Sequence, residues 1–228
     1  PFWETLNAFA GALNFFYFAS DAMVKTVRKY NDPRLDYYFV QYPGGGSPDT
    51  VIGALPGVNN LGYTPWVLSY STDETNALVQ PTAPDVLFTA QESKLLQADA
   101  ILKGYASGSA TDADALLREA ITISMNSFGV DQAAIDDHLA NNVPDLSSLT
   151  TEEAIQVVSE HMFIDCVVRP LEGWTYWRMN EYPALDVPEN AQTTNLVRRL
   201  PYPPDELEAN VNAPAGSRPL DEKMWFDQ

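Results

Sequence analysis

Residues 89–128 contain two apolar stripes of helical spacing, and this feature constrains the fold of the chain most strongly. In the first stripe the apolar side chains recur at i, i+3, i+7 and i+10, the spacing of one face of a helix. They are Leu95, Ala98, Leu102 and Tyr105, and the other side carries Glu92, Lys94 and Asp99. The pattern predicts an amphipathic helix whose charged side faces solvent.

A glycine-containing break at residues 104–108 separates this helix from a second one. Thr111, with Asp114 three residues on, forms an imperfect capping box and predicts the start of the second helix. The inner row of this helix is Ala113, Leu117, Ala120 and Ser124, with Leu116 and Ile121 beside it. Two antiparallel helices bury one face against each other and leave another apolar face, so the pair predicts a stack of further helices.

Two helices are expected before this hairpin. The first covers residues 4–18, and its apolar run is too short to span a bilayer. Ser20 is placed to cap the second. The inner face of that helix comprises Met23, Val24, Val27 and Tyr30. Asn31-Asp32-Pro33 should end it, because the residue before a proline is pushed out of the α region.

Three more helices are expected after the hairpin, the first at residues 131–141. Thr150 and Glu153 form a capping box for the next one, which Pro170 should kink or end. The inward residues expected in these two helices are Ala134, Ile135, Leu139, Ile155, Val158 and Met162. In the third, Trp174 and Trp177 lie at i, i+3, which favours packing of both rings. The tail beyond residue 183 is rich in proline and aromatic residues, which indicates an extended but packed segment.

Residues 36–84 interrupt the helical pattern with glycine, proline and asparagine at short intervals. Irregular segments of this length are uncommon inside a compact domain and are usually functional or disordered. The aromatic residues of the segment argue against disorder. We therefore expect residues 1–228 to form a single domain that carries a long irregular insertion at 36–84.

The charge of the chain excludes several functions. Thirty-one acidic against 13 basic residues give a formal net charge of −18, which repels phosphate backbones and anionic membranes, so no nucleic-acid partner is expected. The single cysteine, Cys166, allows no disulfide framework and lies on an apolar helical row, which favours a small buried hydrophobe over a reactive thiol. We interpret the excess acid as a solvated surface.

The irregular insertion carries the residues that suit a sugar ligand. A protein binds a sugar with aromatic rings that stack on its C–H faces and with amide and carboxylate groups for its hydroxyls. The candidates are Tyr63, Trp66, Tyr70, Asn59, Asn60 and Asp73. The alternative interpretation is that the rings anchor the loop to the helices.

Catalytic and metal-binding patterns are weak by comparison. Glycoside hydrolysis needs two carboxylates held across one bond, and the sequence does not pair any two of its acids. His138 and His161 are too few and too far apart for a triad or a metal site, and His161 lies on a semi-apolar row that favours a partly buried, hydrogen-bonded histidine. No spaced series of calcium ligands is present. We therefore expect no enzyme activity, no metal and no cofactor.

Several motifs together resemble the SusD/RagB family of outer-membrane nutrient-binding lipoproteins, in its second SusD-like branch. They occur in the family's order and at roughly its spacing. They are Asn-Asp-Pro-Arg-Leu at 31–35, residues 87–92 with 102–105, Glu-Gly-Trp-Thr-Tyr-Trp-Arg at 172–178 before Tyr182-Pro183, and Arg-Arg-Leu-Pro-Tyr-Pro at 198–203 followed by Asn210, Asn212 and residues 225–227. The resemblance covers nearly the whole chain but only the C-terminal half of a typical member.

The resemblance implies a mainly α fold of antiparallel, tetratricopeptide-like helix pairs with long irregular loops, although no strict 34-residue period is visible. It implies a non-enzymatic protein that binds an oligosaccharide or other nutrient and hands it to a TonB-dependent, SusC-like transporter. Members are held on the extracellular face of the outer membrane by a lipid anchor, which residues 1–228 do not contain. We expect the chain, which starts at Pro1, to be a mature form or a fragment.

Three function classes stay open from the sequence. The first is nutrient binding, supported by the motifs and the aromatic insertion. The second is a helical-repeat scaffold that binds another protein through its concave face, which the hairpin supports equally well. A glycoside hydrolase is the third and has the least support.

Overall fold

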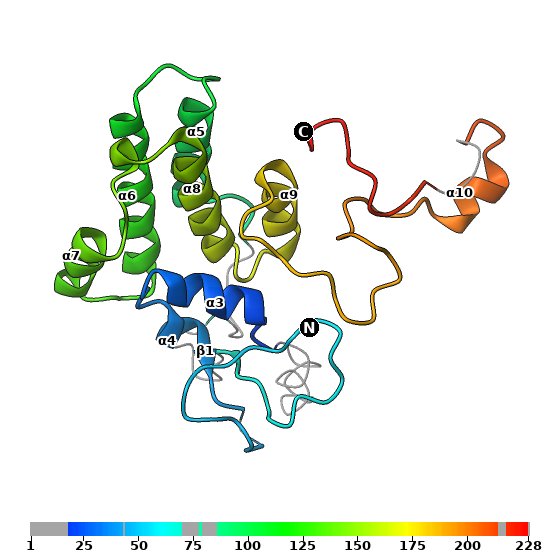
Figure 1. Ribbon diagram of the computed structural model, residues 1–228, viewed down its shortest axis with the longest axis horizontal. Coiled ribbons are helices and arrows are strands. Elements are labelled where there is room, and N and C mark those ends of the chain that lie inside the picture. Colours follow the sequence, from blue (N-terminus) through cyan, green and yellow to red (C-terminus); the bar gives the residue numbers. More distant parts are fainter. Residues whose placement is uncertain (1–17, 43, 70–77, 79–85, 214–217, 228) are drawn as a thin grey trace.

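The computed structural model describes residues 18–42, 44–69, 78, 86–213 and 218–227. Most of the helix expected at residues 4–18 lies outside these ranges. Within them the protein is mainly helical, as predicted, with long irregular connections (Figure 1). None of the described helices is both long and apolar enough to cross a bilayer.

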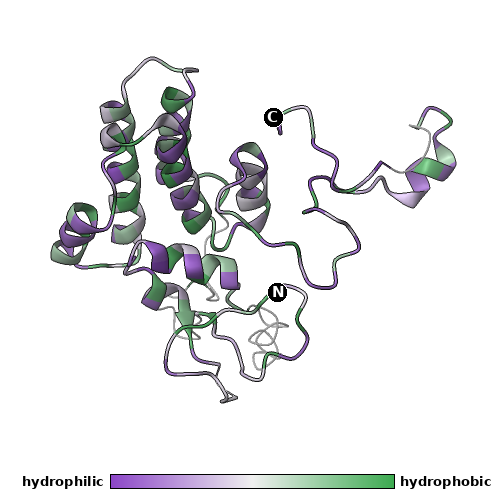
Figure 2. Cartoon of the chain, viewed as in Figure 1, coloured by the Kyte–Doolittle hydropathy of each residue, from purple (hydrophilic) through white to green (hydrophobic). Residues whose placement is uncertain are grey.

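The hairpin at the centre of the fold consists of α5 (Ala90–Leu102) and α6 (Ala110–Ser127). α8 (Thr151–Asp165) packs against α5, and α9 (Pro170–Asn180) packs against α8. Figure 2 shows hydrophobic stretches along α5, α6 and α8 where these helices lie side by side. The predicted stack of helices beside the hairpin is therefore confirmed.

The second hairpin helix starts two residues earlier than predicted. Ser109 caps α6: its hydroxyl accepts from the Asp112 backbone N–H, and the Asp112 carboxylate accepts from the Ser109 backbone N–H at 2.8 Å. Asp114, expected in this role, instead pairs with Arg118. The inner row of α6 is buried as predicted, from Ala113 to Ser124.

The stripe predicted for the first hairpin helix is right in its centre and wrong at its edges. Leu95 and Ala98 are buried, but α5 ends at Leu102, so Tyr105 lies beyond the helix and is 83% exposed. Glu92 and Asp99 were expected to face solvent and are 2% and 7% exposed. The reason is that both acids have partners. Arg169 and Tyr176 donate to Glu92, whereas Asn180, at the end of α9, donates to Asp99, which also pairs with Lys103.

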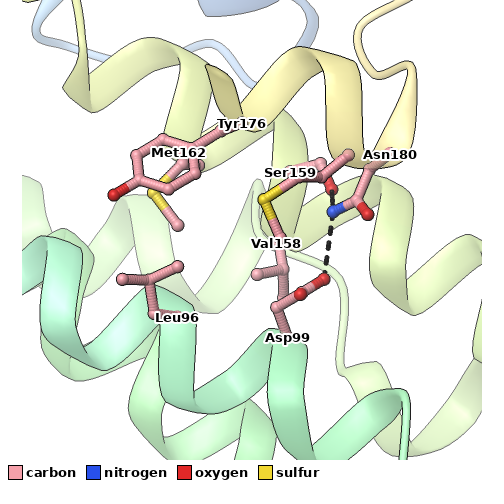
Figure 3. Close-up of a pocket in the computed structure, with 8 residues that line it drawn as sticks. Leu96, Asp99, Val158, Ser159, Met162, Tyr176 and Asn180 are labelled. Carbon is pink, nitrogen blue, oxygen red and sulfur yellow. Dashed lines mark hydrogen bonds between the residues drawn. The ribbon is translucent and has the colours of Figure 1, made fainter. Parts of the chain in front are cut away.

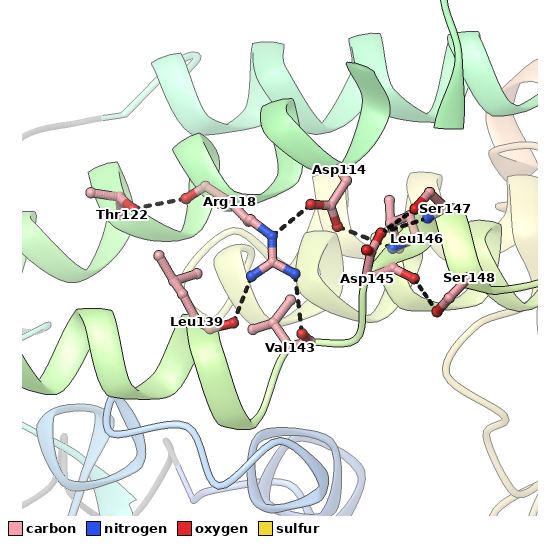
Figure 4. Close-up of polar contacts among 9 residues, drawn as sticks. All are labelled: Asp114, Arg118, Thr122, Leu139, Val143, Asp145, Leu146, Ser147 and Ser148. Atoms are coloured by element: carbon pink, nitrogen blue, oxygen red, sulfur yellow. Dashed lines mark hydrogen bonds and ion pairs between the residues drawn. The ribbon is translucent and has the colours of Figure 1, made fainter. Parts of the chain in front are cut away.

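A clamp formed by Arg118 joins α6 to the segment that follows it (Figure 4). Its guanidinium lies 2.6 Å from Asp114 Oδ2 and donates to the carbonyls of Leu139 and Val143. Asp114 Oδ1 in turn accepts from the Leu146 N–H at 3.1 Å. These contacts fix α7 (Gln132–Asn141) and η1 (Leu146–Ser148), which place Ile135 and Leu146 in the core. Ala134, expected inward on α7, is exposed.

α8 begins with the predicted capping box. The Thr150 hydroxyl accepts from the Glu153 N–H, and Glu153 accepts from the Thr150 N–H at 2.8 Å. Replacing Thr150 with alanine is expected to lower the free energy of unfolding by about 1 kcal/mol, because the helix loses a side-chain cap. Thermal or urea unfolding measures this, with Thr151→Ala, one residue into the helix, as the control. Equal effects of the two substitutions would contradict the capping role.

Pro170 separates α8 from α9, but it does so by starting a helix. α8 ends at Asp165, and Pro170 occupies the first turn of α9, where a missing N–H costs nothing. Between them Cys166 is 4% exposed, and burial raises the pKa of its thiol to about 12. The predicted small buried hydrophobe is confirmed.

The N-terminal part of the described chain surrounds α3 (Asp21–Lys29). Ser20 caps it as predicted, accepting from the Met23 N–H at 3.2 Å, and the expected inner face is buried. α4 (Leu35–Tyr38) and a two-stranded antiparallel sheet, β1 (Phe39–Val40) with β2 (Val67–Leu68), were not predicted. The rest of the described insertion is irregular, as expected.

The C-terminal tail is packed only in part. Arg198 and Asp227 are buried, but α10 (Pro204–Ala209) buries none of its residues. Leu200, Val211 and Trp225 are 71%, 97% and 83% exposed. Figure 1 shows α10 well apart from the helical body. The prediction of a packed tail is therefore wrong for the segment around α10.

Candidate functional site

Backbone hydrogen bonds attach the irregular insertion to the residues just before α3. The Ala19 N–H donates to the Trp66 carbonyl at 2.8 Å, and the Ala54 N–H donates to the Ala19 carbonyl at 2.7 Å. The Trp66 N–H donates to the Ile52 carbonyl at 2.9 Å. Loops held on a rigid scaffold in this way are common carriers of binding residues. We call residues 59–66 the candidate loop, which ends at Trp66, one of these points of attachment.

The two aromatic candidates in this loop are half-buried. The Tyr63 hydroxyl donates to the Gly53 carbonyl at 3.1 Å, and Trp66 Nε1–H donates to the Pro48 carbonyl at 3.0 Å. The Trp66 ring also packs against the hydrophobic core. Both polar atoms are thus used by the insertion's own backbone. This geometry favours an anchoring role for the indole and leaves only part of each ring open to a ligand.

The two amide candidates are exposed. Asn60 Oδ1 accepts from the Gly62 N–H at 3.2 Å, which shapes the turn, and Asn59 lies beside it at the surface. The structure thus brings Asn59, Asn60, Tyr63 and Trp66 together in one loop. Tyr70 and Asp73, the other two candidates, lie outside the described residues.

A largely apolar cavity of about 240 Å³ lies between α3, α8 and α9. Trp174 and Trp177 line it, and their N–H groups donate to the carbonyls of Val197 and Pro183 at 2.9 and 3.1 Å. The Arg178 guanidinium covers the Trp174 ring at 4.0 Å from its centre. Both rings therefore serve packing, as their helical spacing predicts.

A second, polar cavity of about 420 Å³ lies at the C-terminal end of α9. Its wall includes Lys103 from the end of α5, Glu152 from α8 and Lys223 from the tail. A gap of about 10 Å³, room for a single water, adjoins it at Asn180 (Figure 3). Sequence reasoning missed this cavity because its residues come from distant segments, and only the Tyr182-Pro183 motif marks the place.

Both histidines are buried. His161 is 1% exposed and packs against the Tyr30 ring, with the ring centres 4.5 Å apart and the planes tilted by 39°. Neither of its ring nitrogens has a hydrogen-bond partner within the described chain. The expectation of a hydrogen-bonded, partly buried histidine is therefore wrong. Burial, helped by the nearby Arg34 charge, lowers the pKa of His161 to about 3, so it is neutral at ordinary pH. His138 is also buried, with Nε2 at 3.9 Å from Asp32 Oδ2.

The sequence matches the SusD-like family model described as "Starch-binding associating with outer membrane", over residues 3–203. The chain belongs to the SusD-like family. The resemblance inferred from its motifs is therefore confirmed. No match is found among curated proteins.

Solved structures share the fold of this SusD-like chain. A SusD homolog from Bacteroides fragilis NCTC 9343 superposes with a TM-score of 0.72 at 20% identity, covering 92% of this chain and 52% of the homolog. A chitin-binding protein superposes with a TM-score of 0.64 at 23% identity, covering 84% of this chain and 44% of its own length. The chain thus spans about half the length of these structures. At such identities the likeness is one of fold.

Proposed function

We propose that this SusD-like protein binds an oligosaccharide or a related nutrient and does not convert it chemically. The observation that carries the proposal is the family match over residues 3–203, whose description names starch binding. The fold shared with a chitin-binding protein adds support. Residues 1–228 would act as one domain in this role.

We place the ligand at the candidate loop and the residues that follow it: Asn59, Asn60, Tyr63, Trp66, Tyr70 and Asp73. Exposed amides supply both donors and acceptors for sugar hydroxyls. The accessible parts of Tyr63 and Trp66 supply an aromatic surface for the C–H face of a sugar ring. Because the loop is attached to the residues before α3, this surface is held in place before the ligand arrives.

The proposal extends to location and partner. The family description of association with the outer membrane supports a place on the extracellular face of that membrane, with a lipid anchor outside residues 1–228. A TonB-dependent, SusC-like transporter would receive the ligand. Co-purification with such a transporter from native membranes tests this part.

A panel of starch and chitin oligosaccharides tests ligand binding. We expect at least one of them to bind, and we expect Asn59→Ala to weaken that binding about tenfold, as loss of a good polar contact does. Asn141→Ala, which removes an exposed amide from α7, is the matched control. Trp66→Ala is unsuitable, because its half-buried ring also packs on the core. If no member of the panel binds, the proposal is wrong.

A second candidate function is a scaffold that binds another protein. The stack of α5, α6 and α8 favours it, because stacked helix pairs present an extended surface to a partner. The two candidates differ at the candidate loop. Asn59→Ala should leave protein binding intact and weaken only oligosaccharide binding.

A further inference from the structure

The polar cavity of about 420 Å³ at the end of α9 has the size of a small-molecule site, for which volumes of roughly 300–1,000 Å³ are typical. α8 contributes Glu152 and Ile155 to its wall, α9 contributes Asn180, and the tail contributes Lys223. None of its residues belongs to the candidate loop. The cavity is therefore available for a ligand independently of that loop.

Hydrogen bonds and ion pairs join the polar side chains of the wall to one another and to the helices behind them. The Tyr182 hydroxyl donates to Glu152 Oε1 at 2.7 Å, and Lys223 Nζ lies 2.9 Å from Glu181 Oε1. Figure 3 shows the Asn180 amide between two helices, donating to Ser159 Oγ and Asp99 Oδ1 at 2.8 and 3.0 Å. Asn180 is thereby fixed in advance and loses little conformational freedom when a ligand binds, whereas the Lys223–Glu181 pair is 57% and 49% exposed and can rearrange around a guest.

The wall is electrically balanced, although the chain has a formal net charge of −18. Its charged side chains are of both signs in equal number: Lys103, Arg178 and Lys223 against Glu152, Glu181 and Asp227. Such a wall attracts neither cations nor anions as a class. An uncharged ligand that can both donate and accept hydrogen bonds fits it best, and hydroxyl groups do both.

The wall contains both buried and exposed polar groups. Arg178 and Asp227 are 8% and 1% exposed. Arg178 Nε and Asp227 Oδ1 have no hydrogen-bond partner within the described residues. Both atoms are covered by the protein itself, so a guest in the cavity does not reach them. The polar groups that a guest reaches are the exposed carboxylates of Glu152 and Glu181, which accept hydrogen bonds, and the exposed ammonium of Lys223, which donates them. Ile155 and Met179 add apolar surface for the carbon skeleton of that guest.

We propose that this cavity is a second binding site, separate from the candidate loop, and that it takes a single uncharged sugar ring. The proposal rests on the proposed function for its ligand class, carbohydrate. It goes beyond that function by assigning a second place on the molecule and a selectivity for neutral over charged sugars.

Titration with monosaccharides, followed by NMR or calorimetry, tests the second site. N-acetylglucosamine and glucose are the neutral probes, and glucosamine and glucuronic acid are their charged counterparts. We expect the neutral sugars to bind about tenfold or more tightly than the charged ones. Ile155→Trp, which fills the cavity, should abolish this binding, whereas Ala133→Trp on exposed α7 should leave it unchanged.

Tyr182→Phe gives a milder second variant, because it removes one wall hydroxyl and keeps the ring; it should weaken binding of the neutral sugars severalfold. Thermal unfolding of each variant verifies that it is folded. Unchanged binding of the neutral sugars to folded Ile155→Trp overturns the second site. If that variant does not fold, unchanged binding to Tyr182→Phe overturns it instead. Equal affinity for neutral and charged sugars also overturns it. If oligosaccharides bind and Asn59→Ala weakens their binding while Ile155→Trp and Tyr182→Phe do not, the second site fails and the proposed function stands. If no saccharide binds at all, both fail.

Discussion

Replacing Arg34 with methionine is expected to lower the free energy of unfolding by about 3–5 kcal/mol, because the change leaves a buried carboxylate without its partner. Arg34 is 1% exposed, and its guanidinium contacts both oxygens of Asp32, with Nη2 at 2.6 Å from Oδ2. Its Nη1 donates to Ser124 Oγ at 2.8 Å, which joins the segment after α3 to α6. Although burial opposes ionisation of Asp32, the guanidinium holds the pKa of that carboxyl below its usual value.

Urea unfolding of wild type and variant measures this loss. Arg218→Met is the matched control, because Arg218 is 56% exposed and its ion pair with Glu222 is 3.5 Å long. An exposed pair of this kind contributes under about 1 kcal/mol, so the control should unfold nearly as the wild type does. The double variant Asp32→Asn/Arg34→Met should recover part of the lost stability, because it no longer buries an unpaired charge. Similar effects of the Arg34 and Arg218 substitutions would contradict the account.

The second large effect is a loss of stability in acid that originates at His161. Its pKa is about 3 in the folded protein against an ordinary value of 6.5, so the unfolded state binds more protons between these values. The stabilisation is therefore complete above pH 6.5 and is lost as the pH falls toward 3. Between about pH 7 and about pH 4.5 the free energy of unfolding should fall by about 2–3 kcal/mol from this residue.

Unfolding curves across this pH range for wild type and His161→Phe isolate the effect. The variant has no titrating group at this position, so its loss on acidification should be smaller by that amount. His138 remains in both proteins and serves as an internal reference, since its pKa is also lowered by burial. The same loss in both proteins would show that His161 does not titrate as the structure indicates.

The helices were largely predictable because they follow from local rules. Apolar spacing and capping side chains such as Ser20 and Thr150 depend only on neighbours three or four residues away. The start of α6 was misplaced because Asp114 was assigned to a capping box with Thr111. In the structure Asp114 is engaged by Arg118 and by the Leu146 N–H, and Ser109 with Asp112 caps the helix. The two-residue strands could not be predicted, because their pairing joins residues far apart in sequence.

The charged residues show the limit of sequence patterns most clearly. Glu92 occupies the polar side of an amphipathic helix and was expected in solvent, yet Arg169 and Tyr176, more than 70 residues away, bury it through hydrogen bonds. Periodicity reports which side of a helix is apolar and carries no information about which acids find a buried partner. The polar cavity was missed for the same reason, because Lys103 and Glu152 approach only in three dimensions.

The candidate loop was found from composition, since aromatic residues beside asparagines in an irregular segment are visible without a fold. The separate roles of its residues could not be predicted in this way. Only the hydrogen bonds of Tyr63 and Trp66 to backbone carbonyls show that the rings anchor the loop in part, which leaves Asn59 and Asn60 as the freest candidates for ligand contact.

The central claim is that the candidate loop binds a carbohydrate. Isothermal titration of wild type, Asn59→Ala and Asn141→Ala with whichever starch or chitin oligosaccharide binds the wild type tests it most directly. The account predicts a dissociation constant about tenfold higher for Asn59→Ala and unchanged for Asn141→Ala, with all three proteins equally stable. Equal affinity of Asn59→Ala and wild type would contradict the claim and place the ligand elsewhere on the molecule.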